Sequence, residues 1–158
     1  MNYNVVGKYI KNLVFKIPNP EIYSLLSKEI SNYKVNIDIK SNQIKEKLIE
    51  IETSLSLVPI KENLEKIDTK IVFATIVEIT SQKIDKQELE KVILIKVPSS
   101  IYSEIRKIFL FLFETAGFKE IKINETVNFE ELYNKKRLSK NFSLILTLKN
   151  LYVFLAQY

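Results

Sequence analysis

The chain has 158 residues, of which 46% are hydrophobic and 27% are charged, with a formal net charge of +5 and no His, Cys or Trp. Without imidazole or thiol groups it has no Ser-His-Asp triad, no thiolate nucleophile and no soft or borderline metal site. Its two glycines, Gly7 and Gly117, are too few for the glycine-rich loops that bind nucleotide phosphates. We therefore expect one globular domain without a metal or a nucleotide cofactor.

The positive charge is spread along the chain, and its densest cluster consists of Lys135, Lys136, Arg137 and Lys140. Charge distributed in this way favours solubility more than a nucleic-acid partner. Lys8 and Lys11 interrupt the first apolar stretch, so the N-terminal region lacks the uninterrupted core of a signal peptide. We expect a cytoplasmic protein.

Alternation of apolar and polar residues predicts four β-strands, at residues 5–17, 34–40, 48–58 and 70–80. In the first strand this alternation divides the side chains between two faces. One face is expected to carry Tyr9, Lys11, Leu13 and Phe15, and the opposite face Ile10, Asn12, Val14 and Lys16. Short polar connections favour an antiparallel meander. The Pro-Asn-Pro segment 18–20 is expected to support neither helix nor strand.

The clearest predicted helix begins at Pro98, with Ser99 or Ser100 as its N-cap, and ends at Gly117. The preceding residues 83–97 are expected to connect sheet and helix, with a helical start at Asp85. The helix is apolar almost all round, and a sheet covers only one of its faces. We expect a second subunit, or the C-terminal segment, to cover the rest.

The C-terminal residues 142–158 are strongly apolar, although Lys149 and Asn150 interrupt the stretch. This stretch is short for a membrane span and lacks the basic polar face of an interfacial membrane helix. We expect residues 1–158 to form a single domain in which residues 133–158 are an apolar helical extension, without stable membrane insertion.

Several segments together match the sequence motifs of one known protein family. Residues 9–20, Tyr-Ile-Lys-Asn-Leu-Val-Phe-Lys-Ile-Pro-Asn-Pro, are similar to the family's opening Tyr-x-Lys-Asp-x-Ser-Phe-Glu-x-Pro-Asn-x-Pro, and residues 35–39 are similar to the alternating strand that follows it. Further along, the chain matches the family's Pro-x7-Arg helix start, its Gly-Phe and its closing Asn-Phe-x-x-Leu-Tyr with Pro98, Arg106, Gly117-Phe118, Asn128-Phe129 and Leu132-Tyr133. The segments occur in the family's order, and over about residues 9–133 the chain thus resembles the SecB protein-export chaperones.

The resemblance implies an α+β fold, a four-stranded antiparallel sheet with helices packed on one side, assembled through the long helix and the sheet edges as a tetramer, a dimer of dimers. It implies an ATP-independent holdase for unfolded precursor polypeptides, not an enzyme. The family's second strand contributes to client grooves, so Val35, Ile37 and Ile39 are candidate client-binding residues, and Phe15 is a further candidate that would extend the groove. An ordinary core face is the alternative interpretation of these residues.

Two positions depart from the family in a way that bears on its motor partner. Family members present acidic side chains on the outer sheet to the basic tail of SecA, and at the matching positions this chain has Asn12 for Asp and Lys16 for Glu. A neutral and a reversed charge would weaken this docking. SecA is therefore an expected partner whose docking is in doubt.

Other functions are also compatible with the sequence. One is a SecB-like chaperone dedicated to a single client, such as the antitoxin of a toxin–antitoxin pair. Another is a basic RNA-binding or adaptor module that uses residues 135–140. An enzyme based on Glu50 and Glu52 is disfavoured, because two carboxylates on a solvent-facing strand are usually only solvated.

Overall fold

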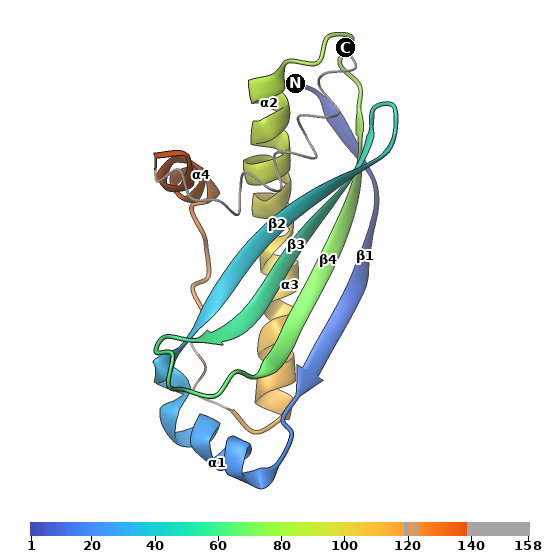
Figure 1. Ribbon diagram of the computed structural model, residues 1–158. Coiled ribbons are helices and arrows are strands. Elements are labelled where there is room, and N and C mark those ends of the chain that lie inside the picture. The colour runs from blue at the N-terminus through green and yellow to red at the C-terminus, as the bar shows by residue number, and fades with distance from the viewer. Residues whose placement is uncertain (119–120, 122, 139–158) are drawn as a thin grey trace.

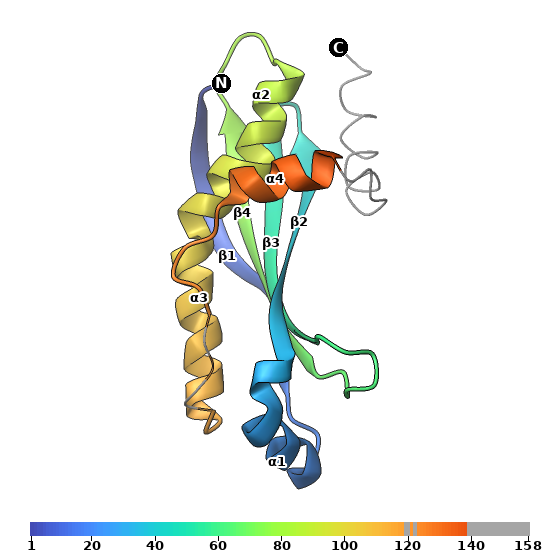
Figure 2. The same cartoon turned by 90° about the vertical axis from the view of Figure 1, so that its left-hand side faces the viewer.

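The structure is a computed structural model that describes residues 1–118, 121 and 123–138. Four antiparallel strands form one sheet, and a long helical segment runs along one of its faces (Figure 1, Figure 2). The strands are β1 (Tyr3–Lys16), β2 (Tyr33–Lys45), β3 (Leu48–Pro59) and β4 (Asp68–Ile79). The helices are α1 (Pro20–Glu29), the 3₁₀ turn η1 (Ile30–Asn32), α2 (Lys86–Lys91), the π-helical η2 (Val92–Lys96), α3 (Val97–Thr115) and α4 (Phe129–Leu138). The predicted α+β class is confirmed.

The strand order in the sheet is β1-β4-β3-β2. The predicted meander is right for β2, β3 and β4 and wrong for β1, which pairs with β4. The reason is the connection after β1: α1 and η1 carry the chain past the end of the sheet to its far edge (Figure 1). Both β1 and β2 are therefore edge strands.

Helix α1 begins inside the Pro-Asn-Pro segment, which was expected to support no helix. Asn19 is the N-cap, and its Oδ1 accepts a hydrogen bond of 2.8 Å from the Ile22 N–H. Pro20 is the first helical residue, where its missing N–H costs nothing. The segment therefore ends β1 and starts α1 in three residues.

The faces of β1 were predicted only in part, because the strand carries two bulges, between Val5 and Gly7 and between Ile10 and Asn12. Ile10 pairs with Phe73 and Phe15 with Thr69, on the helix side, whereas Tyr9 pairs with Ala74 on the outer face. One extra residue moves every side chain beyond it to the other face. The assignment is thus right from Asn12 onward and wrong for Tyr9, Ile10 and Lys11, because the Lys11 side chain contacts Glu50 and Glu52 on the outer face.

Residues 86–115 form one uninterrupted helical segment, so the helix begins well before Pro98. Asp85 caps α2, with its Oδ1 2.9 Å from the Glu88 N–H. The predicted serine caps are wrong, because Lys96 already has helical dihedral angles and Ser100 Oγ donates to the Val97 carbonyl instead. In η2 the Val97 N–H bonds to the Val92 carbonyl, a π-type spacing just before the proline.

The end of α3 agrees with the prediction at Gly117, which has a φ of +94°. The Gly117 N–H bonds to the Glu114 carbonyl at 3.0 Å and the Phe118 N–H to the Phe113 carbonyl at 2.9 Å. These two bonds form a Schellman motif. They turn the chain back along α3, and Ile121 and Ile123 then line a groove together with residues of β2.

The core lies between the sheet and the helical segment. One buried face of α3 consists of Ile101, Ile105, Phe109 and Phe113, each at most 1% exposed, whereas Phe111 on another side of the helix is 64% exposed. Of the two expected covers for that side, a second subunit or the C-terminal segment, the second (residues 142–158) lies outside the described residues. None of the described helices is long and apolar enough to cross a membrane.

Candidate functional site

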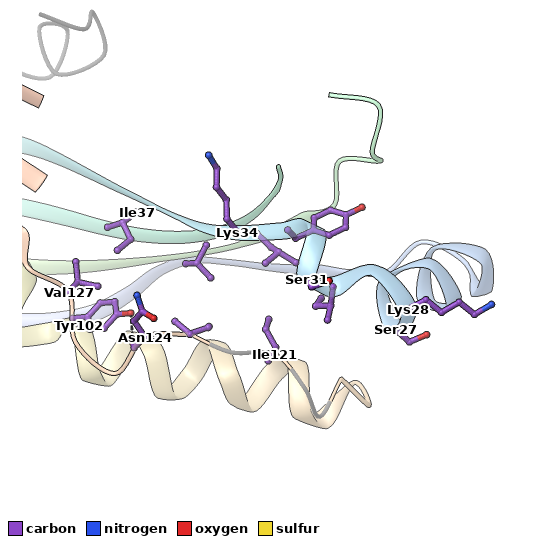
Figure 3. Close-up of a pocket in the computed structure, with 14 residues that line it drawn as sticks. Ser27, Lys28, Ser31, Lys34, Ile37, Tyr102, Ile121, Asn124 and Val127 are labelled. Carbon is purple, nitrogen blue, oxygen red and sulfur yellow. Dashed lines mark hydrogen bonds between the residues drawn. The ribbon is translucent and has the colours of Figure 1, made fainter. Parts of the chain in front are cut away.

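An open groove of about 910 Å³ lies between α1, η1 and the start of β2 on one side and residues that follow α3 on the other. We call residues 121 and 123–127 the strap. Figure 3 shows Ile37 of β2 facing Tyr102 of α3 and Val127 of the strap across the groove. The strap is therefore one wall of the groove, and the β2 edge is the other.

Nine of the 14 residues that line the groove are apolar, although polar and apolar atoms contribute about equally to its exposed surface. Leu57 on β3 is 3% exposed and pairs directly with Val35, while Val35 and Ile37 are only half-buried. The other apolar residues of the lining are Ile30, Tyr33, Tyr102, Ile121, Ile123 and Val127. Its polar residues are Ser27, Lys28, Ser31, Lys34 and Asn124. Partly exposed apolar side chains in a concave surface leave area that a bound chain can cover.

Two tyrosine hydroxyls in the lining are already bonded to backbone. Tyr33 Oη donates to the Glu65 carbonyl at 2.9 Å, and Tyr102 Oη donates to the Asn124 carbonyl at 2.8 Å. Burial raises the pKa of Tyr33, as do the nearby carboxylates of Glu29 and Glu65 to a smaller extent. Burial also raises the pKa of Tyr102, against a smaller lowering by Arg106. Both phenols stay neutral, so the groove offers apolar surface without an activated base.

The structure brings only some of the predicted client-binding residues together. Val35 and Ile37 line the groove, whereas Ile39, two residues further along β2, packs against the buried core and is not among the residues that line the groove. Phe15 lies on the opposite edge strand, with its ring edge-on to Phe113 at a centroid distance of 4.9 Å. Their roles in client binding stay predictions.

Sequence reasoning missed the strap and its attachment to α3. The Nε and Nη2 atoms of Arg106 both donate to the Ile123 carbonyl, at 3.2 and 3.0 Å. The alternation of Ile121 and Ile123 was a weak sign of a chain with one face buried. The position of Arg106 in a family motif gave no indication of what the side chain contacts.

The outer face of the sheet, away from α3, carries Asn12 and Lys16, and both side chains are exposed. Lys16 pairs with Asp68, and Asn12 pairs with the apolar Val72. Directly paired residues share a face, which places Lys34, Lys40, Lys70, Asp38, Glu50, Glu52 and Glu78 here as well. Lys11 joins them, because its ammonium group contacts Glu50 and Glu52. Lysines and carboxylates are therefore mixed over this face of the described sheet, and it is not predominantly acidic.

Glu50 is the best-connected charge on the outer face and is only 7% exposed. Its carboxylate accepts hydrogen bonds from Tyr9 Oη, from Lys11 Nζ at 2.7 Å and from Asn42 Nδ2 at 3.3 Å. Burial raises the pKa of Glu50, but the bonds from Lys11, Tyr9 and Asn42 together outweigh it and lower the pKa below its usual value. A carboxylate held ionised in this way is structural. The described residues also contain no cluster of three or more Asp or Glu side chains that could hold a metal ion.

Comparison with known proteins places these features in one family. The model of the SecB family, preprotein translocase subunit SecB, matches residues 1–140. The putative protein-export protein SecB of Pelagibacter ubique is 36% identical over 135 residues, which cover 85% of this chain and 96% of that protein. The protein-export protein SecB of Anaplasma marginale (strain Florida) is 25% identical over 140 residues, with 82% and 79% covered.

A solved structure has the same fold. It is the Mycobacterium tuberculosis SecB-like chaperone Rv1957 in complex with a ChAD peptide from the HigA1 antitoxin Rv1956, at a TM-score of 0.50 and 12% identity, covering 77% of this chain and 89% of that one. At this identity the likeness concerns the fold alone. The match to the family model and the identity with the Pelagibacter relative show that the chain belongs to the SecB family.

Proposed function

We propose that this protein is an ATP-independent chaperone that holds unfolded precursor polypeptides for export. The observation that carries the proposal is the groove, an open concavity of mixed polar and apolar surface in which the apolar side chains of Val35 and Ile37 are only half-buried. Membership of the SecB family and the names of the relatives, protein-export proteins, support the same function.

The groove suits an unfolded chain because its chemistry is unspecific. Apolar burial stabilises a bound side chain such as Leu or Phe by about 1.5–3 kcal/mol when it is fully covered. A folded protein keeps such side chains in its own core, so the groove would bind the unfolded form selectively. Binding of the unfolded form alone lowers the concentration of chains that are free to fold or aggregate.

We also propose that the protein acts in the cytoplasm as a homotetramer. Edge strand β1 exposes Val5, Val6, Ile10 and Leu13, each at least 41% exposed, and α3 exposes Phe111. A long edge strand with apolar side chains tends to pair with another chain. A second copy of this chain would cover these residues.

The proposed function includes docking to SecA, but with weakened affinity. Asn12 and Lys16 stand where the family's docking acids are expected, and lysines and carboxylates are mixed around them. The net electrostatic attraction between such a face and a basic partner would be small. A client-dedicated chaperone, the alternative, would need no SecA docking at all.

The basic-module alternative has less support from the described residues. Lys135 of α4 lies 2.5 Å from the Glu131 carboxylate, so part of that positive charge is paired within the helix. Lys140 lies outside the described residues. Salt distinguishes the two functions, because nucleic-acid binding falls steeply as salt rises and apolar client binding does not.

The test is suppression of aggregation of an unfolded client by the purified protein, without nucleotide and at low and high salt. We expect suppression near stoichiometric amounts under both conditions. Failure to suppress aggregation or to bind a permanently unfolded protein would contradict the holdase. Affinity capture from the native host then separates a general export chaperone, which captures many precursors, from a dedicated one, which captures one partner.

A further inference from the structure

Arg106 is one of two arginines in the chain, and its side chain has an unusual role. Its Nε and Nη2 atoms both donate to one backbone carbonyl, that of Ile123, at 3.2 and 3.0 Å. Within the described part of the chain it forms no ion pair with a carboxylate. The positively charged guanidinium group therefore binds a backbone carbonyl of the strap.

Tyr102, one helical turn before Arg106, makes the neighbouring contact. Its hydroxyl donates to the Asn124 carbonyl at 2.8 Å, and its side chain also lines the groove (Figure 3). Residues four apart on a helix share a face. The two side chains thus hold two consecutive carbonyls of the strap against α3.

The strap is anchored at both ends by buried aromatic residues that do not depend on these bonds. Before it, Phe118 is 4% exposed and contacts Phe113 at a ring-centroid distance of 5.9 Å. After it, Phe129 is 3% exposed and contacts the Tyr102 ring at 6.0 Å. Loss of the two central hydrogen-bonding groups would free the middle of the strap and leave its ends in place.

We propose that Arg106 and Tyr102 are positioning residues that fix the strap and so set the width of the client groove. The strap residues Ile121, Ile123 and Val127 face β2 across the groove, so an outward movement of the strap changes which side chains fit between the walls. The pair thereby determines client specificity. This inference rests on the proposed holdase function.

Guanidinium geometry explains why an arginine suits this position. Two N–H groups of one rigid plane converge on a single carbonyl and fix its direction, whereas a lysine ammonium offers a single flexible contact. Arg106→Lys is therefore expected to retain part of the function and Arg106→Gln less. Tyr102→Phe removes only the hydroxyl and keeps the ring contact with Phe129.

The first measurement is the distance between the two walls, and it needs no client. The chain has no cysteine, so a spin label at Ser31→Cys and one at Asn124→Cys, both exposed positions on opposite walls, report the groove width by double electron–electron resonance. We expect a narrow distribution in the otherwise unchanged protein and a broader, longer one with Arg106→Gln or Tyr102→Phe added. Lys107→Gln removes an exposed charge from the same helix and should leave the distribution unchanged.

The second measurement is specificity. Two peptides of equal length and charge are compared, one with Leu and one with Trp at alternate positions. We expect Arg106→Gln to shift the ratio of the two dissociation constants by about fivefold or more toward the Trp peptide, with Arg106→Lys in between and Lys107→Gln at the unchanged ratio. Thermal unfolding of each variant shows whether it is still folded. If an Arg106 variant has lost its fold, Tyr102→Phe is used in its place.

The outcomes separate this inference from the proposed function. Unchanged distance distributions, or an unchanged peptide ratio in folded variants, would overturn the positioning role even if clients bind. A protein that binds neither peptide would overturn the holdase, while the distance measurement would still decide whether Arg106 and Tyr102 fix the strap.

Discussion

Lys11 lies between two carboxylates on the outer face of the sheet, with its Nζ 2.7 Å from Glu50 Oε2 and 2.7 Å from Glu52 Oε1. Lys11 belongs to the second of the two bulges of β1, between Ile10 and Asn12, where the strand departs from regular pairing. The hydrogen bonds that Lys11 donates to Glu50 and, to a smaller extent, to Glu52 raise its pKa. The bulge thus directs a lysine onto two neighbouring carboxylates of β3 and ties the edge strand to the sheet interior.

This arrangement predicts a stability that falls in acid. The pKa of Glu50 is lowered in the folded protein, so its ionised form contributes stability above the unfolded-state pKa, and that contribution is lost as the pH falls through the folded-state pKa. Glu50→Gln should reduce the free energy of unfolding by about 1–3 kcal/mol at pH 7. The difference from the original protein should shrink toward pH 3.

The measurement is urea unfolding at both pH values and at one protein concentration, since assembly would shift the apparent stability. Glu78→Gln, an exposed position of β4 on the same face, is the matched control and should change little at either pH. A deficit of Glu50→Gln that stayed constant from pH 7 to pH 3 would show that the charge of Glu50 does not contribute.

The groove predicts a sharp difference between adjacent positions of β2. Ile37 lines the groove, whereas Asn36 is exposed on the outer face. Ile37→Asp places a charge where apolar client side chains would lie and should weaken binding of a permanently unfolded protein by about tenfold or more. Asn36→Asp adds the same charge on the outer face and should leave the affinity within about twofold. Isothermal titration gives both values, and equal effects would exclude the groove as the client site.

The exposed surface of α3 predicts that a charge introduced there changes the oligomeric state of the protein. Phe111 is 64% exposed on a helix whose other face is buried, and a second copy would cover it in the proposed tetramer. Phe111→Asp should shift the molecular mass measured by analytical ultracentrifugation to smaller species, because an unpaired charge is costly in an apolar interface. Ser103→Asp, also exposed on α3, provides the control. An unchanged mass for Phe111→Asp would remove this face from the interface.

Gly117 and Gly7 predict opposite responses to the same substitution. Gly117 has a φ of +94°, and a Cβ there would lie 2.9 Å from Tyr23 Oη. Gly7 has ordinary backbone angles, and its Cβ would meet Ile76 Cδ1 at 3.9 Å, a normal contact. Gly117→Ala should lower the free energy of unfolding by at least about 1 kcal/mol, and Gly7→Ala should be neutral or stabilising. Chemical unfolding tests both, and a neutral Gly117→Ala would contradict the strained-turn argument.

The four strands were predictable because a two-residue alternation sustained over many residues fits a half-buried strand and little else. The bulge at Ile10 was not, since one extra residue shifts the register without any change in composition. The apolar run of η2 was equally ambiguous, because a short apolar run suits a buried helix as well as a strand. Asn19 and Pro20 did carry a helix-start signal, an N-cap before a first-turn proline, but were interpreted as a break.

The groove could be predicted on one side only. Val35 and Ile37 stand out by alternation within a single strand, but the opposite wall depends on contacts between α3 and a segment 17 residues away, such as the Arg106 bonds to Ile123. Such long-range pairing has no local signature. Phe15 is as apolar as the residues that line the groove, but it lies on the opposite edge strand and packs on Phe113. Only the strand order reveals this position.

Two threonines on the helix side of the sheet, Thr53 and Thr75, are each 0% exposed, and neither hydroxyl has a hydrogen-bond partner in the described part of the protein. An unsatisfied buried hydroxyl destabilises the folded state, and valine has nearly the same shape. Thr53→Val or Thr75→Val should therefore raise the free energy of unfolding by about 1 kcal/mol, measured as a higher urea midpoint with an unchanged slope. Ser54→Ala, whose hydroxyl bonds to the Asp38 carbonyl on the outer face, should not stabilise the protein. A lower midpoint for both valine variants would mean that the hydroxyls are hydrogen-bonded in the folded protein.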